Sequence, residues 1–245
     1  MKKTLMTLAL GAILTTIASA DFARIEMGIG AWIQTPSGDI TYADSGVTGS
    51  DTSKKNEESQ AYVWALVKHP VPIIPNLRLE YVGVKSEGEA TGTFKNFTAV
   101  AGDTSLEIIQ YDIIPYYNLL DNTFWLTLDL GVDLKVMNIT YEAPSTVGSY
   151  SSTESVALPL VYLRTRVEIP MTELGFEADV KYISYNSNTM YDVRVKVDYT
   201  FDITPVIQPG IEIGYRIQHI ETDESEDAQI DMNFAGIYAG LMMRF

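Results

Sequence analysis

Residues 235–245 read AGIYAGLMMRF, and apolar side chains recur at every second position of this stretch up to Phe245. Successive side chains of a strand point to opposite faces, so one face here is wholly apolar while the other carries Gly, Tyr, Met and Arg. A final strand with one apolar face and an aromatic end is typical of a membrane-spanning β-barrel. Strands of soluble sheets can show the same pattern, so the remaining sequence has to decide between the two.

The same two-residue period recurs from residue 21 onward, and no convincing helical period competes with it. In residues 124–136, seven apolar positions face one way without interruption, which matches the lipid-facing band of a tilted strand. Because the second to fourth segments alternate less cleanly, eight or twelve strands remain alternatives to the predicted ten. The predicted strands are residues 23–34, 59–69, 76–87, 104–117, 124–136, 157–169, 174–185, 190–203, 207–220 and 235–245.

The predicted connections alternate between short turns and longer loops. The short turns, which are rich in Pro, Asn and Asp, are residues 69–76, 118–122, 170–173 and 202–205. The longer loops are residues 35–58, 88–103, 142–154 and 221–227, with a short exception at 186–188. Outer-membrane barrels have short periplasmic turns and longer outer loops. The predicted fold class is therefore all-β, an antiparallel up-and-down transmembrane β-barrel with both termini in the periplasm.

Aromatic residues support this orientation independently. A membrane barrel carries girdles of aromatic side chains where its surface meets the lipid headgroups. On apolar faces near the predicted short turns lie Tyr117, Phe124, Phe176, Phe201 and Phe245.

The amino terminus has the three parts of a secretory signal peptide. Lys2 and Lys3 precede a mostly apolar run from Leu5 to Ile17, and Ala18-Ser19-Ala20 provides small residues for cleavage before Asp21. We therefore expect residues 1–20 to be removed and residues 21–245 to form the barrel.

Composition excludes several classes of function. The chain has no Cys, which excludes disulfides, thiol catalysis and thiolate metal sites. Asp and Glu number 32 against 17 Lys and Arg, a net charge of −15. Nucleic-acid binding depends on basic surfaces, so we do not expect a nucleic-acid partner.

The face opposite the apolar one carries charges of both signs. Inside a narrow barrel such groups have to pair or be hydrated, so they form either an ion-pair network that fills the lumen or the lining of a narrow channel. Ten strands favour a filled lumen, because open aqueous pores are typical of about 16–18 strands. The candidate lumen residues are Arg24, Glu26, Asp129, Asp133, Lys135, Arg164, Arg166, Asp179, Lys181, Arg194, Lys196, Asp198, Glu212 and Arg216, with Arg78, Glu80, Glu168 and Glu177 on the same face.

Acidic residues in the predicted outer loops could bind Ca²⁺ or Mg²⁺ through oxygen ligands. Asp39, Asp44 and Asp51, together with residues 221–227, show no spacing that resembles a calcium-binding loop. We therefore predict a solvated anionic rim, with neither a metal site nor a cofactor. Gly28 and Gly30 alternate within a strand and have no helix after them, so they are expected to leave room for a large neighbour such as Trp32.

His219 offers the best enzymatic alternative, because omptin-type outer-membrane proteases place His and Asp residues at the outer rim of a ten-stranded barrel. Glu221 and Asp223 lie near it in the sequence, but the spacing does not reproduce the paired motifs of those enzymes. Neither Gly-x-Ser-x-Gly nor His-Glu-x-x-His occurs in the chain. We predict a polar rim histidine and no catalytic residues, and a structural role in a turn for His69.

Residues 69–81 read HPVPIIPNLRLEY. This motif resembles the signature of a family of small proteobacterial outer-membrane β-barrel proteins that has no assigned activity. Ala31-Trp32 and residues 36–40 resemble the first strand and loop of the same family, with shorter matches at 158–160, 183–185, 214–216 and 236–241. The resemblance implies a barrel in the outer membrane and no particular functional residue.

These observations predict a non-enzymatic, integral outer-membrane barrel with a structural or surface-interaction role. A narrow channel for small solutes is the alternative, and an omptin-like protease is the third possibility. The expected partners are outer-membrane lipid, lipopolysaccharide and, during biogenesis, the barrel-assembly machinery. In this fold class a terminal aromatic strand resembles the signal that this machinery reads, so Phe245 is the predicted assembly signal.

Overall fold

The computed structural model describes residues 24–71, 73–204, 206–222 and 228–245, so the predicted signal peptide lies outside the described residues. Within these ranges, no helix is long and apolar enough to cross a membrane. The regular structure consists of the strands β1 (Arg24–Asp44), β2 (Val47–Ser53), β3 (Glu58–Lys68), β4 (Asn76–Gly92), β5 (Asp103–Thr123), β6 (Leu126–Ser145), β7 (Gly148–Glu168), β8 (Leu174–Tyr185), β9 (Asn188–Thr200), β10 (Gln208–Glu221) and β11 (Gln229–Arg244).

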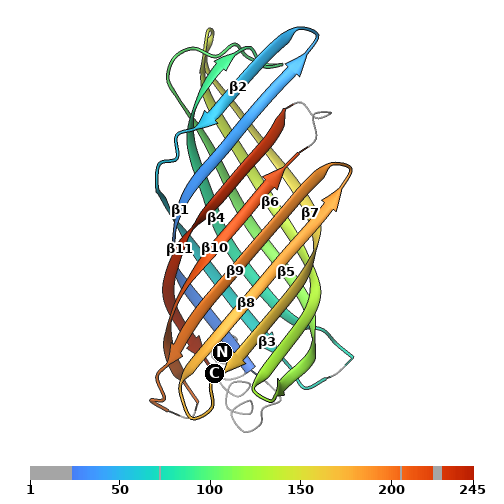
Figure 1. Ribbon diagram of the computed structural model, residues 1–245, viewed down its shortest axis with the longest axis vertical. Coiled ribbons are helices and arrows are strands. Elements are labelled where there is room, and N and C mark those ends of the chain that lie inside the picture. The colour runs from blue at the N-terminus through green and yellow to red at the C-terminus, as the bar shows by residue number, and fades with distance from the viewer. Residues whose placement is uncertain (1–23, 72, 205, 223–227) are drawn as a thin grey trace, which may run out of the picture.

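The strands form one closed antiparallel sheet (Figure 1). From β4 onward each strand pairs with its neighbours in sequence, and β11 pairs with β1 to close the cylinder. One part of β1 pairs with β2 and the other with β3, so these two short strands share a single position around the barrel. The predicted ten-stranded antiparallel barrel is thereby confirmed, with one extra strand. We call the end with the short turns and residues 24 and 245 the inner end, and the opposite end the outer end.

An exposed apolar band surrounds the barrel. In β6, the outward-facing Leu130, Val132 and Leu134 are 42%, 46% and 48% exposed. Farther toward the outer end, the same face carries Asn138 and Thr140. The apolar stretch thus covers about ten residues of strand, the length that a tilted strand needs to cross the hydrocarbon region.

Two of the predicted outer loops are wrong. Residues 35–58 are mostly strand, because β1 continues to Asp44 and turns through Ser45 and Gly46, at φ 49° and 85°, into β2. Residues 142–154 likewise form the outer ends of β6 and β7. Beyond the apolar band both faces of these strands carry polar residues, so the alternation that marks a membrane strand disappears from the sequence.

One inner turn is also misplaced in the sequence prediction. Residues 118–122 belong to β5, and the chain reverses at Phe124 and Trp125, whose φ values are 53° and 66°. These two aromatic residues continue the alternation of the strand that follows, which hid the turn. β9 ends at Thr200 rather than at residue 203. The aromatic residues predicted for the girdle nevertheless lie at or near the inner end.

The barrel is taller on one side than on the other (Figure 1). β5, β6 and β7 contain 21, 20 and 21 residues, whereas β8, β9 and β10 contain 12, 13 and 14. We call the outer parts of β1, β2 and β4–β7 the outer wall. Because β8 pairs with β7 only up to Val161, the outer part of β7 pairs with β6 and with no other described strand. The connection between β4 and β5 packs on this wall, since its Phe97 stacks between Phe94 and Tyr150 at ring-centroid distances of 4.7 and 4.4 Å.

Phe245 completes the ladder that closes the barrel. Its N–H donates to the Ile25 carbonyl at 2.8 Å, and its carbonyl accepts from the Ile25 N–H at 3.3 Å. Deleting Phe245 is expected to reduce assembly, because it removes the two hydrogen bonds with Ile25 that end the seam between β1 and β11, together with the terminal aromatic ring. The amount of heat-modifiable protein in the outer-membrane fraction measures this effect, with Phe245→Tyr as the control that keeps ring and backbone. Equal amounts of the deletion variant and the parent protein would contradict the prediction.

Candidate functional site

The lumen is the candidate functional site, because the inward faces of the strands bring together charges that are far apart in the sequence. All the predicted lumen residues occupy inward-facing positions, and most are almost completely buried. Two further carboxylates of the same network, Asp112 and Asp192, are 2% and 1% exposed and were not among the predicted lumen residues. Asp112 lies on a strand whose alternation is weak, so the sequence did not show which way it faces. Asp192 lies two residues from Arg194 on β9, and strand alternation alone was sufficient to place it on the same inward face.

Glu80, on the inward face of β4, is the centre of one cluster of ion pairs. Its carboxylate accepts from Arg78, Lys181 and Arg194 at 2.5, 2.6 and 2.8 Å. Lys181 also donates to Asp112 at 2.5 Å. The cluster therefore links β4 and β5 to β8 and β9 across the lumen, beyond the contacts between neighbouring strands.

A second cluster lies nearer the inner end, around Glu177 of β8. Arg164 donates to both Glu177 and Asp129 at 2.6 Å. Arg166 forms a two-bonded pair with Asp198, at 2.6 and 2.8 Å. Such bidentate pairs are both stronger and more specific in orientation than single hydrogen bonds, so they fix the relative positions of β7 and β9.

Other charged pairs extend this network toward both ends of the membrane-spanning region. Asp133 is the exception, because neither of its oxygens has a hydrogen-bond partner among the described residues and Lys135 Nζ lies 3.9 Å away. Further pairs include Arg24–Glu168 at 2.9 Å, Arg244–Glu26 at 3.3 Å, Lys135–Asp112 at 2.6 Å, Arg194–Asp179 at 2.8 Å, Lys196–Glu212 at 2.8 Å and Arg216–Asp192 at 2.5 Å.

Trp64 of β3 lies among these charges. Its indole N–H donates to Glu212 at 2.8 Å. Lys196 Nζ lies 4.4 Å and Arg78 Cζ 5.0 Å from the ring centroid. Cation–π contacts of this kind are stronger where water is excluded, so the ring stabilises two cations and orients one carboxylate.

Glycines on β1 provide the space for two of the aromatic side chains. A Cβ on Gly28 would lie 2.3 Å from the Trp64 ring, and one on Gly30 would lie 2.6 Å from the Tyr62 hydroxyl. The glycines therefore make room for a large neighbour, as predicted, but the neighbours are Trp64 and Tyr62 and not Trp32. Cross-strand neighbours, rather than residues of the same strand, occupy the space.

An apolar layer fills the lumen on the outer side of the charged clusters. Ile108, Met137, Met190 and Phe234 project inward from four different strands, and each is at most 3% exposed. They belong to one continuous cluster with the buried aromatic residues beside the charges. The lumen is therefore occupied at two successive levels, by paired charges toward the inner end and by apolar side chains toward the outer end.

His219 does not face the lumen. It lies on the outward side of β10, where its ring stacks on Tyr191 at a centroid distance of 5.0 Å. Its nitrogens are 3.8 Å from Glu221 and 3.9 Å from Asp231. A histidine that acts on a substrate inside the rim would have to point into the mouth, so this geometry does not support a protease-like role for His219. In the described ranges, no three or more His, Cys, Asp or Glu side chains group as a metal site.

No protein-family model matches the chain, and no curated protein matches its sequence. Solved structures do. The outer membrane protease OmpT from Escherichia coli is 10% identical with a TM-score of 0.56, covering 91% of this chain and 96% of that one. The translocator domain of the autotransporter NalP from Neisseria meningitidis is 10% identical with a TM-score of 0.42, covering 100% and 95%. A deletion mutant of the monoaromatic hydrocarbon channel TodX is 10% identical with a TM-score of 0.38, covering 94% and 92%.

At this level of identity the likeness concerns the fold alone. The description of OmpT as a protease therefore says nothing about the activity of this chain, because a fold does not imply a function. The chain has the fold of bacterial outer-membrane β-barrels.

Proposed function

We propose that this chain is an integral outer-membrane barrel that neither conducts solutes nor catalyses a reaction, and that presents its outer wall at the cell surface. The filled lumen is the observation that carries the proposal. Ion pairs and apolar side chains occupy successive levels of the bore, and Arg78, Asp129 and Lys135 are 0% exposed. A bore packed in this way supports a closed barrel rather than a channel. The outward orientation of His219 favours a barrel without catalysis.

The outer wall supports a role at the surface. Cations and carboxylates occur in nearly equal numbers in the lumen, so the excess negative charge of the chain lies elsewhere. Exposed carboxylates occupy the outward face of the wall, at Asp39, Glu89, Glu107 and Glu142. Carboxylates can share divalent cations with anionic lipid headgroups. We therefore propose outer-membrane lipid and lipopolysaccharide as partners, in agreement with the family resemblance of residues 69–81.

Planar-bilayer recording of the refolded protein tests the closed lumen. We expect no stable conductance steps at moderate voltage, because opening a path would require separating buried charges that are paired at short distances. A sixteen-stranded porin in the same bilayer is the positive control. Reproducible open steps that scale with the amount of inserted protein would refute the closed-lumen proposal and favour the narrow channel.

A further inference from the structure

Beyond the short β8–β9 hairpin, the outer part of β7 has one free edge (Figure 1). Successive residues of an antiparallel strand direct their backbone N–H and C=O groups to opposite sides. Near the inner end the Glu168 N–H donates to the turn that leads into β6, whereas the Ile169 N–H donates to the first residue of β8. The pairing of β7 with β6 continues without a register shift as far as Gly148. Odd-numbered residues of β7 therefore face the β8 side along the whole strand.

This alternation explains where β8 stops pairing. In register, Pro159 would face Ser184, but a proline has no N–H to donate, and the β7–β8 ladder ends at Val161. Beyond that point, the backbone groups directed to the free side belong to exposed residues with which no described strand pairs: Ser149, Ser151, Thr153, Ser155 and Ala157. The edge therefore offers a continuous row of donors and acceptors for a further strand.

The edge lacks the features that usually prevent a strand from pairing further. Such features are Lys or Pro on the edge, a bulge, or a very short strand. Between Gly148 and Leu158 there is neither Lys nor Pro, and the only charged residue is Glu154, on the inward face. In contrast, the opposite edge of the outer wall, on β1, consists only of residues 42–44 within the described ranges. The β7 edge is therefore open to another strand.

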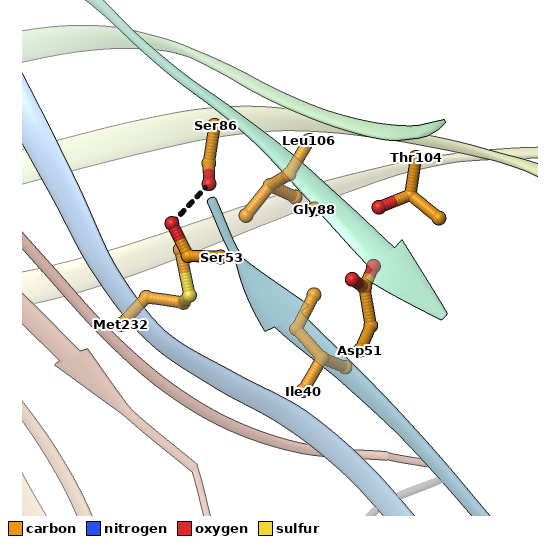
Figure 2. A pocket seen from close by; sticks show the side chains of 8 residues that line it. All are labelled: Ile40, Asp51, Ser53, Ser86, Gly88, Thr104, Leu106 and Met232. Atoms are coloured by element: carbon orange, nitrogen blue, oxygen red, sulfur yellow. Dashed lines mark hydrogen bonds between the residues drawn. The ribbon is translucent and has the colours of Figure 1, made fainter. Parts of the chain in front are cut away.

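Contacts on the inner face of the outer wall hold this edge in place. The Tyr150 ring at its outer end stacks on the connection between β4 and β5. Asp51, predicted to lie in a solvated rim, is 5% exposed and accepts from the Tyr141 hydroxyl at 2.7 Å, so β2 is tied to β6 across β4 and β5. Figure 2 shows the small cavity beside Asp51, where the Ser53 and Ser86 hydroxyls connect β2 to β4. A strand held in this way binds a partner with little loss of its own conformational freedom.

We propose that the free edge of β7 binds an extended polypeptide segment of a partner protein, which adds to the outer wall as an antiparallel strand in line with β8. This inference rests on the proposed presentation of the outer wall at the cell surface and names the class of partner. Inward side chains of the segment would lie opposite Leu158, Val156 and Glu154. Val156 and Leu158 are partly buried against the apolar cluster of the lumen, and Glu154 is an exposed carboxylate. The matching segment therefore carries two apolar residues and then a basic one, at every second position.

A second copy of the chain does not fit this edge within the same membrane. Only one side of β7 is free, so two copies would have to pair around a two-fold axis perpendicular to the outer wall. The wall continues the barrel beyond the membrane-spanning region, so that axis would lie in the plane of the membrane. The second barrel would then be upside down in its membrane. The edge therefore selects a segment that comes from outside the membrane.

Fluorescence polarisation of a labelled peptide added to the refolded protein tests this proposal. The probe Val-Thr-Val-Thr-Lys-Thr-Ser-Thr-Tyr matches residues 158 to 150 in antiparallel order. We expect saturable binding that is abolished by N-methylation of the probe's threonines, whose N–H groups would face β7. Thr153→Pro removes one edge donor, leaves the ladder with β6 intact and should weaken binding by at least about tenfold. Thr153→Ala keeps that donor and should bind the probe as the parent protein does.

Reversal of the charge pair provides a second measurement. Glu154→Lys should bind the probe more weakly and should prefer a probe with Glu in place of Lys. Absence of saturable binding to the parent protein would overturn the proposal, as would equal binding by the parent protein and Thr153→Pro. Self-association of the parent protein that Thr153→Pro abolishes would assign the edge to a second copy instead. Because the assay uses refolded protein, a negative result would refute the peptide partner without bearing on the closed lumen or on the exposure of the wall at the cell surface.

Discussion

Replacing Glu80 with Gln is expected to lower the free energy of unfolding by about 3–5 kcal/mol, because it removes the one carboxylate charge that three buried cations share. Glu80 accepts from Arg78, Lys181 and Arg194 within 2.8 Å. Gln keeps the volume of the side chain but supplies neither the charge nor the second acceptor oxygen. The three cations would then repel one another in a region from which water is excluded. Urea unfolding of the refolded protein in lipid vesicles measures the change.

Glu89→Gln is the matched control, since Glu89 lies on the same strand, faces outward and is exposed. This substitution should change the free energy of unfolding by less than about 0.5 kcal/mol. A double-mutant cycle with Lys181→Met then isolates the pair itself. Equal losses for Glu80→Gln and Glu89→Gln would show that the lumen is hydrated enough to solvate unpaired cations, and would weaken the case for a closed barrel.

Trp64→Ala is expected to cost about 3–5 kcal/mol, the range for removing a buried aromatic ring from a packed interior. The ring is 2% exposed. Its removal would leave a cavity beside Gly28, deprive Glu212 of a donor and remove the aromatic face next to Lys196 and Arg78. Because part of the loss comes from the cations, Trp64→Phe should recover some of the stability through packing without restoring the hydrogen bond to Glu212.

Trp125→Ala provides the comparison, because Trp125 lies in an inner turn and is 56% exposed. We expect a loss of at most about 1 kcal/mol at this surface position. Unfolding in vesicles and tryptophan emission spectra distinguish the two sites. A loss for Trp125→Ala as large as that for Trp64→Ala would mean that anchoring at the membrane interface, rather than lumen packing, dominates stability.

Which residues face the lumen was predictable from the sequence, because strand alternation assigns each residue to one of two faces. Arg164 and Arg166, for example, sit two residues apart on β7, and both face inward as predicted. The pairing partners were not predictable. Glu80 and Arg194 are 114 residues apart and meet only because the sheet closes. The stagger of strands around a closed barrel determines such contacts, and no local pattern encodes it.

The outer wall was missed for a different physical reason. Once a strand leaves the hydrocarbon region, its outward face no longer has to be apolar, so residues such as Ser151, Thr153 and Ser155 resemble a loop in composition. Asp51 was assigned to the solvated rim on the same basis. Pairing of β2 with β4, with Asp51 opposite Ala90, turned its carboxylate inward. Polar strands outside a membrane therefore have to be identified from register rather than from hydropathy.

The uneven height of the barrel leaves one strand with an incomplete set of backbone partners. The hairpin of β8 and β9 ends where its outward apolar face ends, while β6 and β7 continue beyond it (Figure 1). Residues 148–160 of β7 pair with β6 on one side, and the described residues provide no strand on the other side. The backbone N–H and C=O groups along that edge therefore have to be satisfied by water or by another chain, as at the edge of an open sheet. A barrel that is closed around its membrane-spanning part thus keeps one sheet edge beyond it.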